Sequence, residues 1–516
     1  MSASRAAAAA APGHYWLGWS CYILAVLALV LLLPSNGLDP EVTRFVTLVG
    51  AIAAWRYGWQ AIHHVRALIF RHRRFPRQRA MADMIDARDC TPHVYCLITS
   101  YRMDAAVKLI TYRALFRDVI DFGAPATIVA AVTDAGDEML IERQFASFDP
   151  PEHVSLVLMR QAGTGKRDAM AAGLRAISRR NPPPGAALIL MDGDVVLPPG
   201  TLKRSLPFFQ LMPDLGAFTV DNDVVSDDSH WAREWYALRF AQRHMLMCSM
   251  SLSRRVLVLT GRFSVFRAGI ATDPSFIDIV ENDYLDHWRL GRIRFLTGDD
   301  KSTWFWLLRR RWQMMYLPDV SVRCLESLPS KSFIGSSMRL MQRWFGNMLR
   351  NNGRSIALGP RCAGFFTWWC LVDQRLSIWT TLSGPTFAVL ISLSGRPEAI
   401  PLYAIWVIFS RLLQTGVIRL HRRHISPYYP VLLYYTQVIG SAVKVYMSFR
   451  IDRQNWTRQG IRNVTRHSHT LLQGNAFTAY LNLLAIGVFL FAAALIADVV
   501  KLPGQVHSVD FSKWNY

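Results

Sequence analysis

An acidic triplet in the middle of the chain has the residue types and spacing of a divalent-metal site. Asp192, Gly193 and Asp194 come directly after the apolar run AALILM at 186–191. Two carboxylates flanking a glycine can face one cation, and the glycine lets a diphosphate come close to the backbone. Mg²⁺ and Mn²⁺ prefer carboxylate oxygens together with substrate phosphates. We therefore expect Asp192 and Asp194 to bind such a metal, although surface turns also produce this triplet.

A second acidic pair suits acid–base chemistry. Asp299 and Asp300 follow Thr297-Gly298 and precede the aromatic-rich segment KSTWFWLL at 301–308. Where two carboxyl groups lie side by side near apolar rings, one of them can have the raised pKa that a general base needs. The same position also fits a helix N-cap, for which Asp is favoured. The sequence leaves both interpretations open.

Basic residues near these motifs can bind an anionic group. Lys166 and Arg167 open a predicted helix, where they either bind phosphate or lie in solvent. The preceding glycines lack the GxxxxGK[ST] spacing, and Arg167 stands where Ser or Thr is needed, which argues against a Walker-type NTPase. Arg343 and Trp344 lie on an amphipathic stretch, 331–350. There they either meet a diphosphate and a sugar face or fix the helix at a membrane surface.

The elements that must position these residues alternate between short apolar runs and helical patterns. The predicted strands are 94–99, 126–132, 154–159 and 186–191, and the helices between them are 104–121, 137–148 and 166–180. Continuous apolar strands separated by helices indicate a parallel sheet covered on both faces. Ligands of such sheets bind beyond the carboxyl ends of the strands. Thr99, Asp134 and Asp137 follow the first two strands and are therefore further candidates.

Composition places this domain in a membrane protein. The chain has 516 residues, 51% of them hydrophobic and only 18% charged, with a mean hydropathy of +0.16. These values exclude a disordered, collagenous or coiled-coil chain. The formal net charge of +21 fits nucleic acid, an anionic membrane surface or a polyanionic substrate. Because the excess of Lys and Arg clusters at the ends of apolar segments, we expect no nucleic-acid binding.

The apolar segments flank a long polar region. An N-terminal hairpin is predicted at 16–33 and 45–62, and the five arginines of 71–79 place its basic end in the cytoplasm. Further spans are predicted at 376–394, 399–419 and 477–499. The run 430–449 has basic residues on both sides, in 419–424 and 450–466, so we favour an interfacial or re-entrant helix over a simple crossing.

The predicted domains are 1–70, the N-terminal hairpin; 71–330, the cytoplasmic enzyme domain; 331–375, amphipathic interface helices; 376–500, C-terminal transmembrane and interfacial helices; and 501–516, a tail too short for a cyclic-dinucleotide module.

As an ordered set, these motifs and segments resemble the processive membrane-embedded glycosyltransferases of family 2. Within that family the chain is most similar to the alginate polymerases, or mannuronan synthases. The matching stretches are AGTGKRDAMAAGLRAISR (162–179), LRFAQRHMLMCSMSLSRRVL (238–257), TGRFSVFRAGIATDPSFI (260–277), HWRLGRIRFLTGDDKSTWF (287–305) and RIDRQNWTRQ (450–459).

The resemblance implies a fold, a reaction and roles for the candidate residues. The fold is an α/β GT-A domain with a mostly parallel sheet, inserted between transmembrane helices of the bacterial inner membrane. The reaction is inverting transfer of mannuronate from GDP-mannuronic acid to a growing poly-β-1,4-mannuronate, with help in its export. It implies that Asp192 and Asp194 bind Mg²⁺ or Mn²⁺ and that Asp300, with Asp299 beside it, is the general base. It also implies that Trp344 stacks on the acceptor sugar. The residues implied to bind the nucleotide sugar are Thr99, Asp134, Asp137, Lys166 and Arg343.

The resemblance also implies partners and has two departures. The partners are membrane lipid, a separate cyclic di-GMP-binding co-polymerase, and periplasmic export and modification proteins. The family's Gln three residues before Arg343 is Leu340 here, and its paired acid at the second strand is spread over Asp134 and Asp137.

An anionic sugar also needs a cation near its carboxylate. The candidates lie between the two acidic motifs and are Arg239, Arg243, His244, Arg262 and Arg267.

Two other functions remain open on the sequence. The same acidic and Arg-Trp motifs would serve a β-glucan synthase of the cellulose or curdlan kind that uses UDP-glucose. A non-catalytic polysaccharide transport subunit is the second alternative, although such a subunit would normally have lost the four carboxylates.

Overall fold

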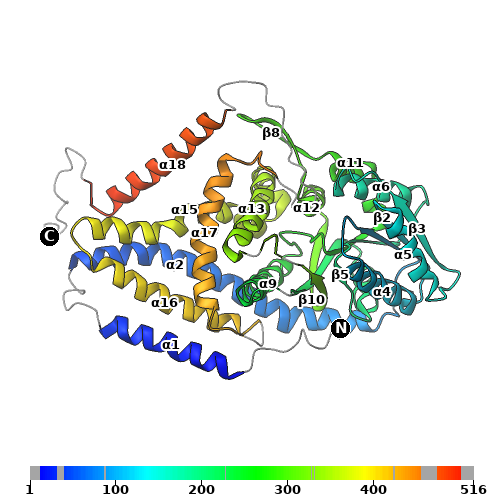
Figure 1. Ribbon diagram of the computed structural model, residues 1–516, viewed down its shortest axis with the longest axis horizontal. Coiled ribbons are helices and arrows are strands. Elements are labelled where there is room, and N and C mark those ends of the chain that lie inside the picture. Colours follow the sequence, from blue (N-terminus) through cyan, green and yellow to red (C-terminus); the bar gives the residue numbers. More distant parts are fainter. Residues whose placement is uncertain are drawn as a thin grey trace, which may run out of the picture.

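The computed structural model describes residues 12–31, 40–86, 89–226, 228–326, 328–330, 332–421, 425–454 and 474–500. An α/β domain and a group of long helices lie at opposite ends of the molecule, and α9, α12 and α13 lie between them (Figure 1). The predicted tail 501–516 and parts of the basic flanks 419–424 and 450–466 are outside the described residues.

The sheet of the α/β domain has eight strands in the order β3-β2-β1-β4-β7-β6-β10-β5. The first four along that order are parallel, because helical crossovers connect them. Strand β7 is antiparallel to both β4 and β6, and β10 runs parallel to β6. The strands are β1 (Val94–Thr99), β2 (Ala126–Val132), β3 (Val154–Arg160), β4 (Ala187–Asp192), β5 (Val195–Val196), β6 (Leu215–Val225), β7 (Phe263–Arg267) and β10 (Gln313–Leu325); β8 (Tyr284–His287) and β9 (Gly291–Arg294) form a separate hairpin. All four predicted strands are confirmed.

Helices cover this sheet as the crossover pattern requires. α4 packs against α5, whereas α6 packs against α11. Asp104 and Asp134 cap α4 and α5 by accepting hydrogen bonds from Ala106 N and Gly136 N. The helices of the domain are α4 (Ala105–Phe122), α5 (Ala135–Ala146), α6 (Lys166–Ser178), α7 (Thr201–Ser205), α8 (Pro207–Leu211), α10 (Ala268–Ala271) and α11 (Pro274–Asn282).

Three helices connect the sheet to the rest of the molecule. They are α9 (His230–Ser251), α12 (Asp299–Arg309) and α13 (Phe333–Ala357), and the short α14 (Gly359–Ala363) follows. α9 contacts β6 and β10 on one side and α2 on the other, and α13 contacts α12 and α17. A second apolar core forms where these helices meet, with Trp235, Leu340 and Leu432 among its buried members.

The long helices supply the membrane part. Among the described residues, three helices are long and apolar enough to cross a membrane, and they coincide with the three predicted C-terminal spans: α15 (Phe365–Leu393), α16 (Ala399–Ile418) and α18 (Asn475–Ile496). α1 (Pro12–Leu31) is also apolar, but its apolar part, Tyr15–Leu31, is shorter than these three helices. The chain is therefore a membrane protein.

Two helices differ from the expected pattern. α2 (Pro40–Ile69) is longer than the predicted span 45–62 and continues through the π-turn Phe70–Arg74 into α3 (Phe75–Asp83), so most of the basic run 71–79 is helical. α2 is not one of the three membrane-length apolar helices, and its Arg66 donates to Ser253 Oγ at 2.5 Å beside α9. α17 (Tyr429–Phe449) runs across the direction of α2, α15 and α16 in Figure 1. That orientation agrees with an interfacial helix, which stays a prediction.

Candidate active site

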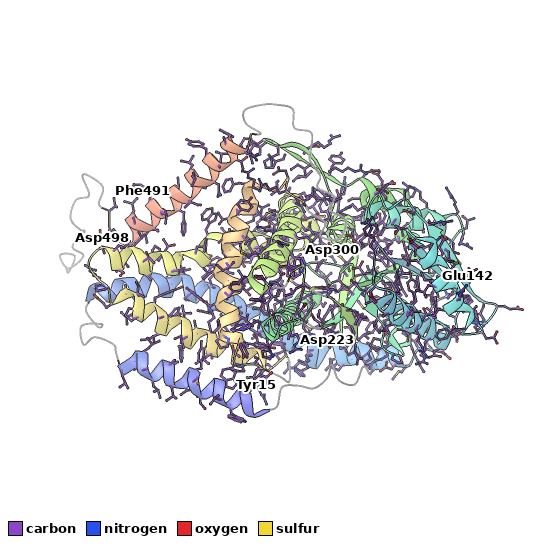
Figure 2. All side chains as sticks on the ribbon, in the orientation of Figure 1. Tyr15, Glu142, Asp223, Asp300, Phe491 and Asp498 are labelled. Carbon is purple, nitrogen blue, oxygen red and sulfur yellow. The ribbon has the colours of Figure 1, made fainter. Side chains whose placement is uncertain are left out.

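A cavity of about 450 Å³ lies where the carboxyl ends of the parallel strands meet α9, α12 and α13. Thr99 at the end of β1 is the register partner of Asp192 at the end of β4. Figure 2 shows Asp300 in the interior, between the α/β domain and the long helices. Of the ten residues predicted from the sequence, eight line this cavity: Thr99, Lys166, Asp192, Asp194, Asp299, Asp300, Arg343 and Trp344.

The turn that carries Asp192 and Asp194 is held tightly against the end of β1. Gly193 N donates to Thr99 O at 3.0 Å. A side chain at position 193 would place its Cβ 2.4 Å from Ser100 Oγ and 2.9 Å from Thr99 O. Only glycine fits this turn, because the clashing atoms include backbone. The sequence predicted that a diphosphate comes close to Gly193, and the structure shows that the end of β1 does so.

Lys166 joins the two acidic motifs. Its Nζ lies 2.7 Å from Asp192 Oδ1 and 2.9 Å from Asp299 Oδ2. Burial alone would lower the pKa of Lys166, but the two carboxylates outweigh it and raise that pKa above its ordinary value. Gly261 covers this contact, since a Cβ there would be 3.0 Å from Lys166 Nζ. Lys166 therefore stays charged and fixes the distance between the motifs.

The carboxyl groups of Asp299 and Asp300 are in different electrostatic states. Burial raises the pKa of Asp299, but Lys166 and Arg167 outweigh it and hold the pKa below the ordinary value. Burial and then the Asp299 charge raise the pKa of Asp300. Gly298, with φ of +87°, occupies the cap position of α12, so neither aspartate is the N-cap. An acid with a lowered pKa thus lies beside one with a raised pKa, which suits general-base chemistry at the second.

Arg167 does not share the position of Lys166. Its guanidinium is buried and donates to Val280 O at 2.8 Å and Ser302 Oγ at 2.9 Å. It therefore ties α6 to α11 and α12 and does not line the cavity.

Helix α13 brings Arg343 and Trp344 to the cavity on one helical face with Leu340 and Asn347. The Trp344 ring stacks on Trp235 of α9, with centroids 5.7 Å apart. Leu340, which stands in the place of the family's Gln, is buried and lines the cavity, so it contributes apolar surface there.

Helix α9 supplies a wall of which the sequence predicted the two arginines, Arg239 and Arg243, but not Tyr236 and Phe240. Tyr236, Arg239, Phe240 and Arg243 face the cavity at the three- and four-residue spacing of one helical face. This spacing is visible in the sequence and is the signal that would have identified the wall. Arg239 Cζ lies 4.5 Å from the centroid of the Trp344 ring, a cation–π contact beside the stacked indoles.

The structure separates the five cationic candidates for sugar recognition. Arg267 donates to main-chain carbonyls, and His244 contacts Tyr316 and Asp221, both away from the cavity. Arg262 lines the cavity but pairs with Glu326. Arg243 donates to Asn222 Oδ1 at 2.8 Å while its buried Nη2 has no hydrogen-bond partner among the described groups. Arg239 and Arg243 are thus the two that line the cavity and have no carboxylate ion pair among the described residues.

Asp134 and Asp137 lie outside the cavity lining. Asp134 caps α5 through Gly136 N, and Asp137 pairs with Lys108 of α4. Thr133, directly before Asp134, lines the cavity in their place.

A network behind the cavity positions Asp299 and Asp300. Asn347 of α13 accepts from Thr297 Oγ1 at 2.7 Å and from Arg350 at 2.5 Å. Gln454, beyond the end of α17, accepts from Leu296 N at 2.9 Å and donates to Arg294 O at 2.8 Å. Gln454 lies in the matching stretch 450–459, but no local pattern indicates this role, because its partners are 158 and 160 residues away.

The residues present fit a divalent cation in part. Asp192 and Asp194 offer carboxylate oxygens to the cavity, and no group of three or more His, Cys, Asp or Glu side chains within the described ranges forms a complete metal site. An ion held by these two carboxylates takes its other ligands from water and a diphosphate, as Mg²⁺ and Mn²⁺ do.

Each comparison with known proteins finds glycosyltransferases. A family model described as "Glycosyltransferase like family 2" matches residues 92–347. Glycosyltransferase alg8 of Pseudomonas syringae pv. tomato is 42% identical over 442 residues, which are 86% of this chain and 90% of the relative. Glycosyltransferase alg8 of Azotobacter vinelandii is 43% identical over 444 residues, with the same coverage of both chains. Among solved structures, the mannosyltransferase PcManGT from Pyrobaculum calidifontis, in complex with GDP-Man and Mn²⁺, has a TM-score of 0.46 at 16% identity, over 77% of this chain and 97% of its own.

Proposed function

Because this chain belongs to glycosyltransferase family 2, and within it to the alg8 glycosyltransferases, we propose that it polymerises mannuronate from GDP-mannuronic acid into poly-β-1,4-mannuronate. The observation that carries the proposal is the convergence of two acidic motifs, Lys166, Arg343 and Trp344 on one cavity. This set supplies a base, cations for a leaving diphosphate and an aromatic platform for a sugar.

The reaction is a single inverting displacement. Asp300 accepts the proton of the acceptor hydroxyl, whose oxygen attacks the anomeric carbon as the bond to GDP breaks. Asp299 stays ionised beside Lys166, so its charge keeps the proton affinity of Asp300 high. Trp344 stacks on the acceptor sugar, and the Trp235 ring behind it fixes the plane of the indole.

Cations stabilise the departing GDP. Lys166 lies between the motifs, and Arg343 lines the same cavity from α13. Asp192 and Asp194 would hold Mg²⁺ or Mn²⁺, which neutralises charge that develops on the diphosphate. Thr99 lies at the nucleoside end, at the carboxyl edge of β1.

Recognition of the donor carboxylate is assigned to Arg243. Its Nη2 is buried at the cavity without a hydrogen-bond partner among the described groups. A buried unpaired donor is costly, and a sugar carboxylate removes that cost. The rival donor UDP-glucose has no sugar carboxylate and offers this guanidinium only neutral hydroxyl oxygens.

The proposed setting is the bacterial inner membrane, with the α/β domain in the cytoplasm. The arginines of 71–79 support this orientation, because basic residues flank membrane helices on the cytoplasmic side. The helical part would then help the polymer across the membrane, with a separate cyclic di-GMP-binding co-polymerase and periplasmic proteins as partners.

The test is a nucleotide-sugar assay on membranes that contain the full chain. Membranes receive GDP-mannuronic acid or UDP-glucose with Mg²⁺ or Mn²⁺, and released GDP or UDP and polymer are measured. We expect GDP and an acidic polymer only from the first donor. The matched controls are Asp300→Asn, expected to be inactive, and Asp286→Asn, an exposed acid that should not matter. UDP release with a neutral polymer would favour the β-glucan synthase, and equal activity of Asp300→Asn would favour the transport subunit.

A further inference from the structure

A second cavity, of about 350 Å³, lies where the α/β domain meets the start of a membrane-length helix. Its volume is within the range of about 300–1,000 Å³ that is usual for ligand sites. Its walls come from the loop after α9, the turn that leads from α12 into β10, and the first turn of α15. Within the described chain it shares no lining residue with the active-site cavity, so it is a separate site.

Three arginines line this second cavity, and none of its described lining residues is acidic. They are Arg254 and Arg255, after α9, and Arg311, before β10. Among the described residues, none of the three forms an ion pair with Asp or Glu. Arg254 donates instead to Gln313 Oε1 at 3.3 Å, which is a neutral partner. Because like charges held close together repel, an anion between these arginines is stabilised.

The backbone fixes two of these arginines in a conformation that residues with side chains rarely adopt. Arg254 has a φ of +54° and Arg311 a φ of +63°, in the left-handed region that favours glycine. Arg255 ties the two positions together, because its guanidinium donates to Arg254 O at 3.0 Å and to Arg311 O at 3.2 Å. The fold therefore holds the three positive charges together without a carboxylate between them.

Buried polar groups at this cavity have no hydrogen-bond partner. Thr367 lines the cavity and is 1% exposed, and its Oγ1 has no partner among the described groups. Arg255 Nε is also buried without one. Burial lowers the pKa of Arg255, because removal from water disfavours its charged form. Unpaired buried donors are costly, and an anionic acceptor in the cavity would remove that cost.

The first turn of α15 adds main-chain donors to the same cavity. Gly364, Phe365, Phe366 and Thr367 line it, and the helix has neither a side-chain cap nor an acidic residue in its first turn. The free N–H groups at the start of a helix carry a partial positive charge and bind phosphate groups. Guanidinium, hydroxyl and main-chain N–H donors around one cavity suit a phosphate.

The position of the cavity indicates the source of the phosphate. α15 is one of the three membrane-length helices, and its first residue, Phe365, is 70% exposed with Trp368 one turn further on. Aromatic residues at the end of a membrane helix are typical of the level of the lipid headgroups. On α2, the exposed Val65 comes directly before Arg66, whose Cζ lies 3.6 Å from the centroid of the Phe366 ring. Apolar surface and a further cation thus lie at the edge of the cavity.

We propose that this second cavity binds the phosphate of an anionic phospholipid from the leaflet that faces the α/β domain. The phosphate accepts hydrogen bonds from Arg254, Arg311 and Thr367, and the acyl chains extend past Phe365 into the bilayer. Basic pockets beside membrane helices bind anionic headgroups through the same chemistry. The bound lipid connects two loops of the α/β domain to α15. This inference goes beyond the proposed function and does not depend on the donor sugar.

The experiment measures lipid binding to the full chain, purified in a neutral detergent. The probes are water-soluble short-chain phosphatidylglycerol, short-chain phosphatidylcholine and inorganic phosphate, and calorimetric titration gives each dissociation constant. The variants are the double substitution Arg254→Gln and Arg311→Gln, and Thr367→Val. The matched control is Arg309→Gln with Arg361→Gln, which removes two exposed positive charges of α12 and α14 that line neither cavity.

The parent should bind phosphatidylglycerol more tightly than phosphatidylcholine, whose choline group the arginines repel. A hydrogen bond to a charged group corresponds to about a ten- to hundredfold change in binding, so the double arginine variant should lose at least about tenfold in affinity for phosphatidylglycerol. Thr367→Val should lose about three- to tenfold. Its thermal midpoint without lipid should not fall, because the hydroxyl that it lacks has no partner among the described groups. The control should stay within about twofold, because salt screens exposed charges outside the cavity.

The possible outcomes separate the occupants and the two proposals. Parental affinity in both the double arginine variant and Thr367→Val would overturn the inference, as would an equal loss in the control. Inorganic phosphate that binds as tightly as phosphatidylglycerol would overturn the lipid as the occupant. If the double arginine variant does not fold, Thr367→Val decides. A parent that binds phosphatidylglycerol but releases no GDP from GDP-mannuronic acid would overturn only the proposed function.

Discussion

Replacement of Gln454 by leucine is expected to slow sugar transfer although Gln454 does not line the active-site cavity. The side chain is 4% exposed and clamps the segment that leads into Asp299 and Asp300. Its Oε1 accepts from Leu296 N at 2.9 Å and from Thr297 N at 3.4 Å, and its Nε2 donates to Arg294 O at 2.8 Å. Leucine has a similar size and can make none of these bonds.

The size of the effect follows from the groups left unpaired. The two shorter bonds leave one buried amide and one buried carbonyl, at a cost of about 1–3 kcal/mol each. The segment lowers this cost by moving toward water, which displaces Asp300. A misplacement of about 1 Å in an active site costs about a hundredfold in rate. We therefore expect kcat for GDP release to fall about a hundredfold in Gln454→Leu.

The assay separates positioning from simple loss of folded protein. Donor KM should stay within about twofold, because the nucleotide side of the cavity does not contact Gln454, whereas misfolding would lower the amount of active enzyme and leave kcat per folded molecule unchanged. Gln78→Leu is the matched control, since Gln78 is 8% exposed and, among the described residues, the one hydrogen bond of its side-chain amide is to Met212 Sδ, at 3.8 Å. Parental kcat in Gln454→Leu, or an equal fall in Gln78→Leu, would refute the reasoning.

Three further predictions concern the acids and one buried ion pair. Asp300→Asn should lower kcat by about 10²–10⁴-fold. Because burial and the neighbouring carboxylate raise the pKa of Asp300, the parental kcat should already fall with decreasing pH at a pH above the ordinary Asp pKa of about 3.9. A pH–rate profile of parent and variant measures both effects, and a parental kcat that stays constant toward low pH would contradict the second. Asp192→Asn should raise the Mg²⁺ or Mn²⁺ concentration needed for half-maximal activity, as measured by metal titration after chelation, and an unchanged titration would contradict the metal role. Arg354→Met removes the ion-pair partner of Asp283, bound at 2.6 Å and 5% exposed, and leaves this buried charge with the Ser302 hydroxyl, at a cost of about 3–5 kcal/mol. Its thermal midpoint should fall by several degrees, whereas Arg292→Met, at an exposed ion pair, should not change it.

The elements with a local signature were predictable from the sequence. Each of the first four strands is an apolar run of six or seven residues between helical patterns, and the observed bounds differ from the predicted ones by at most one residue. The parallel order of these strands then places Thr99 beside Asp192. The strand order alone therefore brings a predicted nucleotide-binding residue and a predicted metal ligand together at the carboxyl edge of the sheet.

What the sequence could not supply depends on contacts between distant segments. Lys166 and Asp299 are 133 residues apart, and their ion pair results from packing of α6 against the segment before α12. Asp134 and Asp137 had the expected position after a strand, yet a helix cap and Lys108 engage them.

The packing of α17 links the membrane-length helices to the helix that carries Arg343 and Trp344. α17 contacts α13, which carries Arg343 and Trp344, and it also contacts the membrane-length helices α15 and α16. Membrane helices change their tilt when the hydrocarbon thickness of the bilayer differs from their own apolar length. We expect such a tilt to shift α17, and with it Trp344, relative to Asp300, whose neighbour Asp299 is tied through Lys166 to Asp192 at the end of β4. We therefore expect bilayer thickness, which acyl-chain length sets, to change the rate of polymer synthesis.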